Sequence, residues 1–286
     1  MSLPPDQMIR LQTQLQREQR WRELSRASAQ KSIQPLTSSV NPPFDDVSPA
    51  ATSLDTLKTR LIRTISHEYR TPLTIISLAA ESLAQNRTRL TVEQRQQCFR
   101  QIQQAMRRMT KLINDVLWIS QAEAQEIEPH FSAIPLADFC ERILEELTRL
   151  HPEWGDRLQA QVRTPFVAVP SDPFLLQQLV LQLLINALKY SEPEQPVTLE
   201  LVIARAMLRI RVCDRGRGIP ASECDRIYDC FYRAQNVESI AGTGLGLTIA
   251  KQCVDLLGGQ IDCTSRLGQG SEFQVKLPLA VRHRRR

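Results

Sequence analysis

Two long amphipathic segments with a short polar break between them constrain what the first half of this chain can fold into. From Leu54 to Leu83 the apolar residues recur at the spacing of one helical stripe, and a second stripe runs over residues 91 to 123. Thr91 and Gln94 have the spacing of a capping box, which marks a helix start. Two antiparallel helices alone make a thin core. The pattern therefore predicts an all-α dimerising hairpin, with a four-helix bundle formed by two chains.

The remainder of the chain, from about residue 127, mixes helical and strand patterns. Residues 135–150 and 246–259 have helical patterns, and Asp172 with Pro173 is typical of a third helix start. Alternating segments predict two strand pairs, 197–204 with 207–214 and 260–265 with 271–277. These elements predict an α+β sandwich, in which one mixed sheet is covered on one face by helices.

Length and composition fit an ordinary globular protein with two domains. The chain has 286 residues, of which 42% are hydrophobic and 23% charged. We expect a short helical segment at 1–33, a linker rich in Pro, Ser and Thr at 34–53, the hairpin at 54–124, the α+β domain at 127–280 and a basic tail at 281–286. The most apolar segment, LLQQLVLQLLINAL from Leu175, is interrupted by glutamines, and the N-terminus has no hydrophobic signal-peptide core. We therefore expect no membrane span and a cytoplasmic location.

Charge and cysteine usage exclude several classes of protein. Four arginines in the last five residues account for most of the net charge of +5, which indicates a solvated tail and no nucleic-acid-binding face. Seven cysteines include no C-x-x-C pair, and the four histidines are scattered. A zinc site and a disulfide framework are therefore not expected.

The segment GTGLGL, residues 242–247, runs directly into a predicted helix. Glycines allow backbone N–H groups to approach an anion closely, and the helix dipole favours negative charge at that end. A glycine pattern of this kind is weak evidence for phosphate binding by itself, and stronger evidence when it opens a helix. It predicts a phosphate-binding loop.

Two further patterns carry polar residues next to buried elements. LLINALKYS places Asn186, Lys189 and Tyr190 after an apolar helical run, although Asn186 alone could be a hydrogen-bonded residue at a helix end. DRGRGIP places Asp214 where a strand leaves the sheet. A tight turn would explain its glycines but not that carboxylate.

The stretch TISHEYRTPLT sets His67 and Glu68 side by side in a helical context and places Pro72 one turn later. Proline cannot donate to the carbonyl four residues back, which here belongs to Glu68. The sequence therefore predicts a locally weakened helix at the His-Glu pair. On the helical period, His67 should point away from the apolar stripe that contains Ile65.

Together and in this order, these segments resemble the signature boxes of the sensor histidine kinases of two-component systems. The matching segments are SHEYRTPL (H box), LLINALKYS (N box), DRGRGIP (G1 box), IYDCFYRA (F box) and GTGLGL (G2 box), within residues 54 to 280. The resemblance implies a histidine phosphotransfer and dimerisation domain followed by an ATP-binding domain of the kinase, gyrase and Hsp90 type. It also implies a homodimer, ATP and Mg²⁺ as cofactors, and a response regulator as partner.

In the first domain, the resemblance implies that His67 is the phosphoaccepting nucleophile and that Glu68 holds the imidazole tautomer and accepts its proton. Thr71 completes an E-x-x-T pattern that resembles the phosphatase motif of bifunctional kinases. The alternative is that Thr71 merely precedes a proline. Pro72 is expected to allow bending, and Tyr69, where leucine is common, to change packing only.

In the second domain, the resemblance implies that Asn186 ligates Mg²⁺, while Gln182 stands where the family more often has Asn and is a less certain ligand. Lys189 and Tyr190 resemble nucleotide contacts, and Asp214 resembles the acceptor for the adenine amino group. The resemblance also implies that Gly216 and Gly218 form the turn that admits the adenine base, and that Phe231 and Arg233 belong to a mobile lid at 219–241. The remaining implied ATP-binding residues form the phosphate loop: Gly242, Thr243, Gly244, Leu245, Gly246 and Leu247.

Two other readings share part of this pattern. Gyrase, Hsp90 and MutL-like ATPases and the anti-sigma serine kinases have the same type of ATP domain, but none needs SHEYRTPL on a dimerising hairpin. A nucleotide-bound scaffold without catalysis would not need His67, Asn186 and the G2 glycines intact. The sequence does not identify the input signal, the cognate regulator, or whether autophosphorylation occurs in cis or in trans. Residues 1–53 could dock on a separate sensor protein.

Overall fold

The computed structural model describes residues 49–85, 90–164, 167–237, 240 and 242–279, and within the first helix it describes side chains at residue 65 and from residue 68 onward. The expected helical segment at 1–33, most of the linker at 34–53 and the basic tail at 281–286 lie outside the described residues. None of the helices in the described ranges is both long and apolar enough to cross a membrane.

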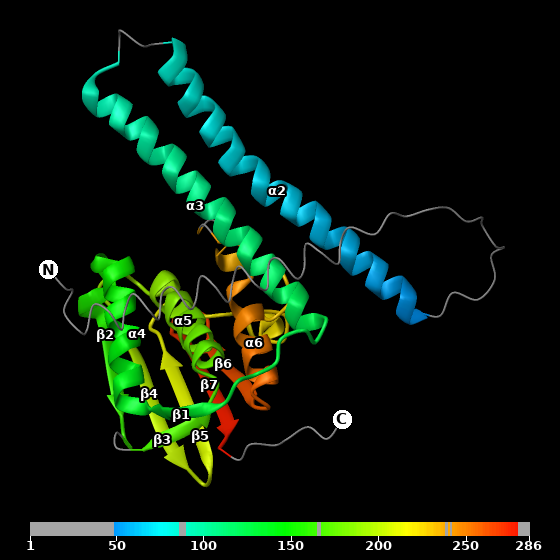
Figure 1. The fold of residues 1–286 in the computed structure, drawn as a ribbon, viewed down its shortest axis with the longest axis vertical. Coiled ribbons are helices and arrows are strands. Elements are labelled where there is room, and N and C mark those ends of the chain that lie inside the picture. The colour runs from blue at the N-terminus through cyan, green and yellow to red at the C-terminus, as the bar shows by residue number, and fades with distance from the viewer. Residues whose placement is uncertain (1–48, 86–89, 165–166, 238–239, 241, 280–286) are drawn as a thin grey trace, which may run out of the picture. The chain divides into compact units, whose positions relative to one another are not determined.

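The first half of the chain is a helical hairpin made of α2 (Pro49–Gln85) and α3 (Val92–Glu123) (Figure 1). The predicted capping box is confirmed, because the Gln94 amide donates to Thr91 Oγ1 at 3.2 Å and the Thr91 amide donates to Gln94 Oε1 at 2.9 Å. The first helix begins at Pro49, five residues before the expected Leu54. Proline is tolerated at a helix start because its missing N–H would have no partner there, so the linker ends earlier than predicted.

The second half is built on a five-stranded mixed sheet with the order β2-β4-β5-β7-β6. Its strands are β2 (Leu158–Val162), β4 (Val197–Ala204), β5 (Met207–Cys213), β6 (Gln260–Arg266) and β7 (Gly270–Pro278). The two predicted antiparallel pairs, β4 with β5 and β6 with β7, are confirmed, and β2 joins β4 in parallel. The expectation of one mixed sheet is thus confirmed for the larger sheet.

Three short strands were not predicted. They are β2 and a separate antiparallel pair, β1 (Ser132–Pro135) with β3 (Ala168–Ser171). Each has four or five residues, and β1 and β3 both contain a proline. Segments this short carry too few alternations for a period-2 pattern to stand out.

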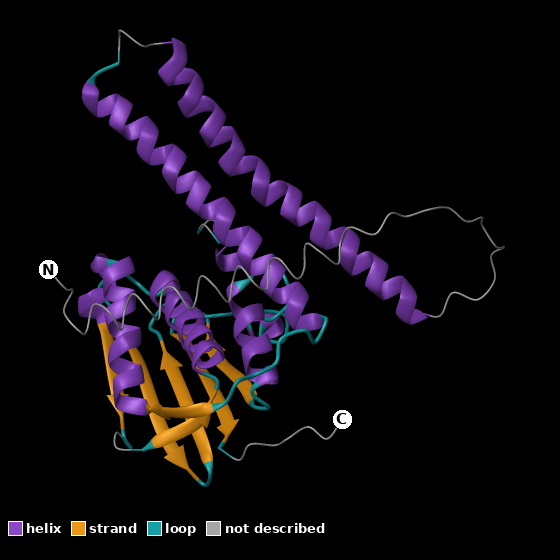
Figure 2. Cartoon of the chain, viewed as in Figure 1, coloured by secondary structure: helices purple, strands orange, loops and turns teal. Residues whose placement is uncertain are grey.

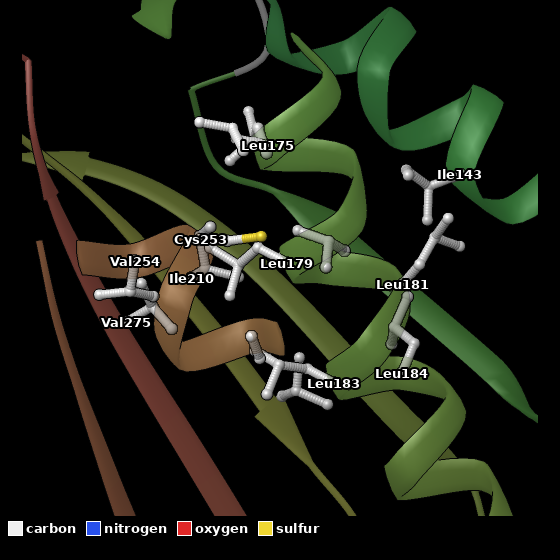
Figure 3. Close-up of a cluster of buried hydrophobic side chains, with 14 of the residues drawn as sticks. Ile143, Leu175, Leu179, Leu181, Leu183, Leu184, Ile210, Cys253, Val254 and Val275 are labelled. Carbon is white, nitrogen blue, oxygen red and sulfur yellow. The ribbon is translucent and has the colours of Figure 1, made fainter. Parts of the chain in front are cut away.

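Three helices, α4 (Leu136–Leu150), α5 (Pro173–Tyr190) and α6 (Gly246–Leu256), cover one face of the larger sheet (Figure 2). Figure 3 shows the resulting core, in which Leu179 and Leu183 of α5 and Val254 of α6 lie against Ile210 and Val275 of the central strands. The other face of the sheet is polar, and there Arg211 pairs with Glu200 at 2.7 Å. Helix α5 is buried along most of its length, and at its C-terminal end Asn186, Lys189 and Tyr190 are partly exposed.

The described part of the chain between β5 and α6 contains no long helix or strand. Its described part holds two short 3-10 turns, η2 (Ala221–Glu223) and η3 (Gln235–Val237), and a third, η1 (Pro152–Arg157), follows α4. We call residues 219–241, of which the structure describes 219–237 and 240, the lid segment.

Candidate active site

Helix α5 begins at a capping aspartate and carries its candidate site residues near its C-terminal end. Asp172 caps α5 by accepting hydrogen bonds from the amides of Phe174 (2.8 Å) and Leu175 (3.0 Å). Gln182 and Asn186 are four residues apart and so share one face of the helix. Gln182 is only 8% exposed, whereas Asn186 is partly exposed, and no hydrogen bond to another described residue holds its amide. The Asn186 carbonyl oxygen is thus free to act as a hard ligand.

The G2 loop lies directly over this end of α5, which brings the two predicted motifs together. A Cβ built on Gly242 would stand 2.1 Å from Lys189 Nζ, and one built on Gly246 would stand 3.0 Å from Gln182 Oε1. The Lys189 ammonium also donates to the Tyr190 hydroxyl at 3.0 Å and lies 4.5 Å from the centre of that ring. A lysine and a helix N-terminus therefore face the same small region, as a phosphate site requires.

The lid segment contacts the G2 loop through Gly244. This glycine has φ +72°, and a Cβ there would meet the backbone of Phe231 at 2.7 Å. Phe231 itself has φ 62°, in the left-handed region that bulky residues rarely adopt. Strain of this kind persists only where surrounding contacts hold it, and here the held residue is one of the predicted lid residues.

Asp214 follows β5 directly and is 8% exposed. Its Oδ1 accepts a hydrogen bond from the Gly216 amide at 2.9 Å, and its own amide donates to the Ser271 carbonyl at 2.9 Å. Burial raises the pKa of this carboxyl to about 6, while the hydrogen bonds from Gly216 and Ser271 oppose the shift. The group is a buried acceptor that is ionised near neutral pH.

The glycines of the G1 turn are required by close backbone packing. A Cβ on Gly216 would lie 2.2 Å from the Tyr190 carbonyl oxygen, and one on Gly218, with φ +65°, would lie 2.0 Å from the Arg266 carbonyl oxygen. The Arg217 amide also donates to the Tyr190 carbonyl at 3.3 Å. These contacts hold the turn against the end of α5, so Asp214, Lys189 and Tyr190 belong to one region.

A buried carboxylate that the sequence reasoning missed organises the lid segment. Glu223 is 9% exposed, and its Oε2 accepts hydrogen bonds from the Tyr232 hydroxyl (2.8 Å) and the Gln235 amide (3.3 Å). The Arg226 guanidinium lies 4.3 Å from the centre of the Tyr232 ring. No periodic pattern marks these residues, because they join parts of a loop rather than one face of an element.

Arg233, predicted in the lid, donates to carbonyls of its own loop. Its guanidinium bonds to the Val237 carbonyl oxygen at 2.7 Å and to the Ile240 carbonyl oxygen.

A second residue that the sequence reasoning missed is Gly270, with φ 96°, where a Cβ would stand 2.1 Å from the Asp214 carbonyl oxygen. The turn pattern RLGQG gave the signal for that glycine, but not for its contact with Asp214.

The H box lies within α2, which continues through Pro72 without a break (Figure 2). His67 is part of this helix, and its side chain lies outside those described. Glu68 is partly buried, Thr71 is exposed and Pro72 is buried. Tyr69 packs against the main hydrophobic core, which extends to Trp118 near the end of α3.

Comparison with known proteins connects both halves to one class. Residues 57–125 match the model of the His Kinase A (phospho-acceptor) domain, and residues 171–281 match that of the histidine kinase-, DNA gyrase B-, and HSP90-like ATPase family. The adaptive-response sensory kinase SasA of Crocosphaera subtropica is 30% identical over 78% of this chain and 59% of its own length. The circadian input-output histidine kinase CikA of Synechococcus elongatus is 33% identical over 80% of this chain and 31% of its own length.

A solved structure, that of full-length ShkA in complex with AMPPNP, is also similar. It has a TM-score of 0.57 and 26% sequence identity, and the match covers 77% of this chain and 46% of that one. The chain belongs to the sensor histidine kinases. It spans less than two thirds of the length of the curated relatives named above.

Proposed function

We propose that this chain is an ATP-dependent protein-histidine kinase that phosphorylates itself on His67 and passes the phosphoryl group to an aspartate of a response regulator. The observation that carries the proposal is the convergence of the N, G1 and G2 boxes around the end of α5. There Lys189 meets the Gly242 backbone, and the turn after Asp214 packs on the Tyr190 carbonyl. The relatives named as sensory kinases and the neighbour in complex with AMPPNP support the same reaction.

The described residues supply most of what nucleotide binding needs. The Asp214 carboxylate is the acceptor for the adenine amino group, and Lys189 with the G2 amides balances the phosphate charge. Mg²⁺ commonly takes one or two protein oxygens together with substrate phosphates, and it would neutralise charge on them. The free amide oxygen of Asn186 fits that requirement. Gln182, almost fully buried beneath Gly246, is a weaker candidate ligand.

The acceptor side of the reaction requires an imidazole that is neutral when it attacks. His67 would attack the γ-phosphorus with one ring nitrogen, while Glu68 holds the other and takes up its proton. Phosphoryl transfer depends mainly on positioning and on neutralising charge. The protein therefore needs to bring α2 and the nucleotide together. Pro72, which removes one backbone hydrogen bond, would ease bending at that point.

We also propose that the chain acts as a homodimer through its hairpin, residues 54–124. Four large apolar side chains occur at every seventh position of α3 and are exposed, namely Val92 (60%), Phe99 (56%), Met106 (56%) and Ile113 (41%). A seven-residue apolar repeat is the signature of a helix that packs along another. Leu73 and Leu78 of α2 are exposed as well. A second hairpin is the occupant we propose for this surface.

The kinase proposal is tested by His67→Gln in the whole chain. We expect incorporation of label from γ-phosphate-tagged ATP to be lost, while the dissociation constant for ATP stays within about twofold, because the nucleophile is not part of the nucleotide pocket. Asp214→Asn, the matched control, should instead weaken ATP binding. Label retained on the His67 variant in an acid-labile, base-stable form would remove His67 from its role.

Thr71 is the candidate residue for a second activity, dephosphorylation of the regulator. It is exposed on α2, one turn after His67, and its hydroxyl can orient a water in line with a phosphorus atom. We expect Thr71→Ala to leave autophosphorylation and phosphotransfer intact but to slow decay of the phospho-regulator severalfold. Equal decay rates with the wild-type and variant proteins would leave this chain a kinase only.

A further inference from the structure

The C-terminal end of helix α5 has backbone carbonyls that need donors from outside the helix. The last hydrogen bond of the helical pattern runs from the Ser191 amide to the Ala187 carbonyl at 3.0 Å. The carbonyls that follow, from Leu188 onward, have no partner within the helix. The Arg217 amide of the G1 turn donates to one of them, that of Tyr190, at 3.3 Å. A side chain donates to another, that of Leu188.

Arg157, the last residue of the turn η1, supplies that side chain. Its three guanidinium nitrogens donate to three different carbonyl oxygens: Nη1 to Leu188 (3.3 Å), Nη2 to Glu192 (2.9 Å) and Nε to Gln195 (3.2 Å). A guanidinium presents its donors in a fixed plane, so the three contacts hold the helix end and the loop after it in one arrangement. The helix macrodipole also favours a cation at this end.

Arg157 holds the same short segment that carries polar residues of the candidate nucleotide site. Asn186 and Lys189 flank Leu188 on α5. The Lys189 ammonium lies close to the G2 loop, since a Cβ built on Gly242 would stand 2.1 Å from Nζ. A shift of the helix end would therefore move the Asn186 amide and the Lys189 ammonium together.

The end of α5 also sets the position of the G1 turn. Ser191 and Gly216 pair in an isolated antiparallel bridge, and a Cβ built on Gly216 would stand 2.2 Å from the Tyr190 carbonyl oxygen. The Gly216 amide in turn donates to Asp214 Oδ1 at 2.9 Å. Both contacts with Gly216 are made by residues that stand in the chain between two carbonyls bound by Arg157. Arg157 therefore also restrains the turn that orients Asp214.

Arg163 shows how differently a nearby arginine is used. It follows β2, its side chain is 57% exposed, and it pairs with Glu200 on the polar face of the sheet. Arg157 is partly buried and forms no ion pair with a carboxylate among the residues that the structure describes. Charge-assisted hydrogen bonds are stronger than neutral ones, so its three bonds to backbone carbonyls fix the path of the chain there.

We propose that Arg157 is a positioning residue of the nucleotide site, which acts through the end of α5 on Lys189 and on the turn after Asp214. The role needs a guanidinium, because three nitrogens reach three oxygens and the single nitrogen of a lysine cannot reproduce that geometry. The effect on nucleotide binding rests on the proposed kinase function. The hydrogen bonds to the backbone do not.

The test measures the dissociation constant for Mg²⁺-ADP by titration calorimetry on the whole chain. We expect Arg157→Ala to raise this constant at least about fivefold, because a misplacement of about 1 Å can cost about a hundredfold. Arg157→Lys keeps the positive charge and the aliphatic stem, and it should raise the constant nearly as much. Arg163→Ala, the matched control, removes an equal charge but should leave the constant within about twofold of the wild-type value.

Rescue by a small cation distinguishes a positioning role from a purely structural one. In Arg157→Ala, millimolar ethylguanidinium has access to the space left at this partly exposed site and can donate to the same carbonyls. The dissociation constant should then fall back toward the wild-type value. Ethylammonium, with the same charge and one nitrogen, should not restore binding. Neither cation should strengthen binding by the wild-type protein or by Arg163→Ala.

Three results would overturn the role of Arg157. They are wild-type affinity in both Arg157 variants, wild-type affinity in Arg157→Lys alone, which would make the charge sufficient, and failure of ethylguanidinium to restore binding better than ethylammonium does. Circular dichroism checks the helical content of each variant, and Arg157→Lys carries the test should Arg157→Ala not fold. A wild-type chain that binds no Mg²⁺-ADP would instead overturn the proposed function, and this inference with it.

Discussion

At the scale of single residues, Asp214 predicts a pH dependence of nucleotide binding. The ionised carboxylate is the stronger acceptor for an amino group, and its pKa is raised to about 6 by burial. ATP affinity should therefore fall as pH drops below about 6, by up to about tenfold per unit. Titration calorimetry between pH 5 and pH 8 would measure this effect. Asp214→Asn is the control, because titration of the ATP phosphates affects both proteins equally. The same slope in both proteins would exclude Asp214 as the titrating group.

The sign is opposite for the stability of the protein without nucleotide. A carboxyl whose pKa is higher in the folded than in the unfolded state binds its proton more tightly when folded. This group therefore lowers the free energy of unfolding as pH rises from about 4 to about 6, and the loss persists above that range. Asp214 thus destabilises the fold at the pH at which it is the better acceptor, as is common for site residues.

Glycines show how far residue types alone could predict the site. The sequence marked Gly242, Gly244 and Gly246 because glycines that open a helix suit a phosphate. The structure adds that Gly244 has a left-handed φ and meets the Phe231 backbone. Contacts made by loop residues, such as Gly270 with Asp214 or Glu223 with Tyr232, carry no periodic signal. They could not be predicted from spacing.

At the scale of elements, the sequence predicted best where a cap or a long period was present. The Thr91 and Gln94 box, the Asp172 cap and the two antiparallel strand pairs are all confirmed. Short strands such as β1 were missed because four residues give little pattern. The start of α2 was placed late because the linker and the helix share prolines, and only tertiary structure distinguishes a proline at N1 from one in a loop.

The exposed heptad of α3 gives the prediction at this scale. Met106→Glu places a charge in the middle of the surface that we assign to the second hairpin, and burying that charge without a partner is costly. We expect the variant to be a monomer in sedimentation at micromolar concentration, where the wild type is a dimer. Gln104→Glu is the control, since this exposed position lies about 200° around the helix from Met106. A dimeric Met106→Glu protein would place the interface elsewhere.

At the scale of the whole molecule, the proposed reaction divides its work between the two halves. The hairpin carries His67, the acceptor we propose, on α2, while the sandwich brings Lys189 to the G2 loop and packs the turn after Asp214 on the end of α5. This division explains why the nucleotide pocket could be assembled from one half alone. The central prediction is therefore that His67 is the phosphorylated residue.

That claim is tested most directly by mapping the phosphoryl group after incubation of the whole chain with ATP. Trypsin should release residues 64–70, TISHEYR, which contain His67 together with Thr64, Ser66 and Tyr69. We expect mass spectrometry at alkaline pH to find this fragment phosphorylated, and brief acid treatment to remove the group, as for a phosphohistidine. Phosphate on this fragment that survives acid, or phosphate found only on another fragment, would contradict it.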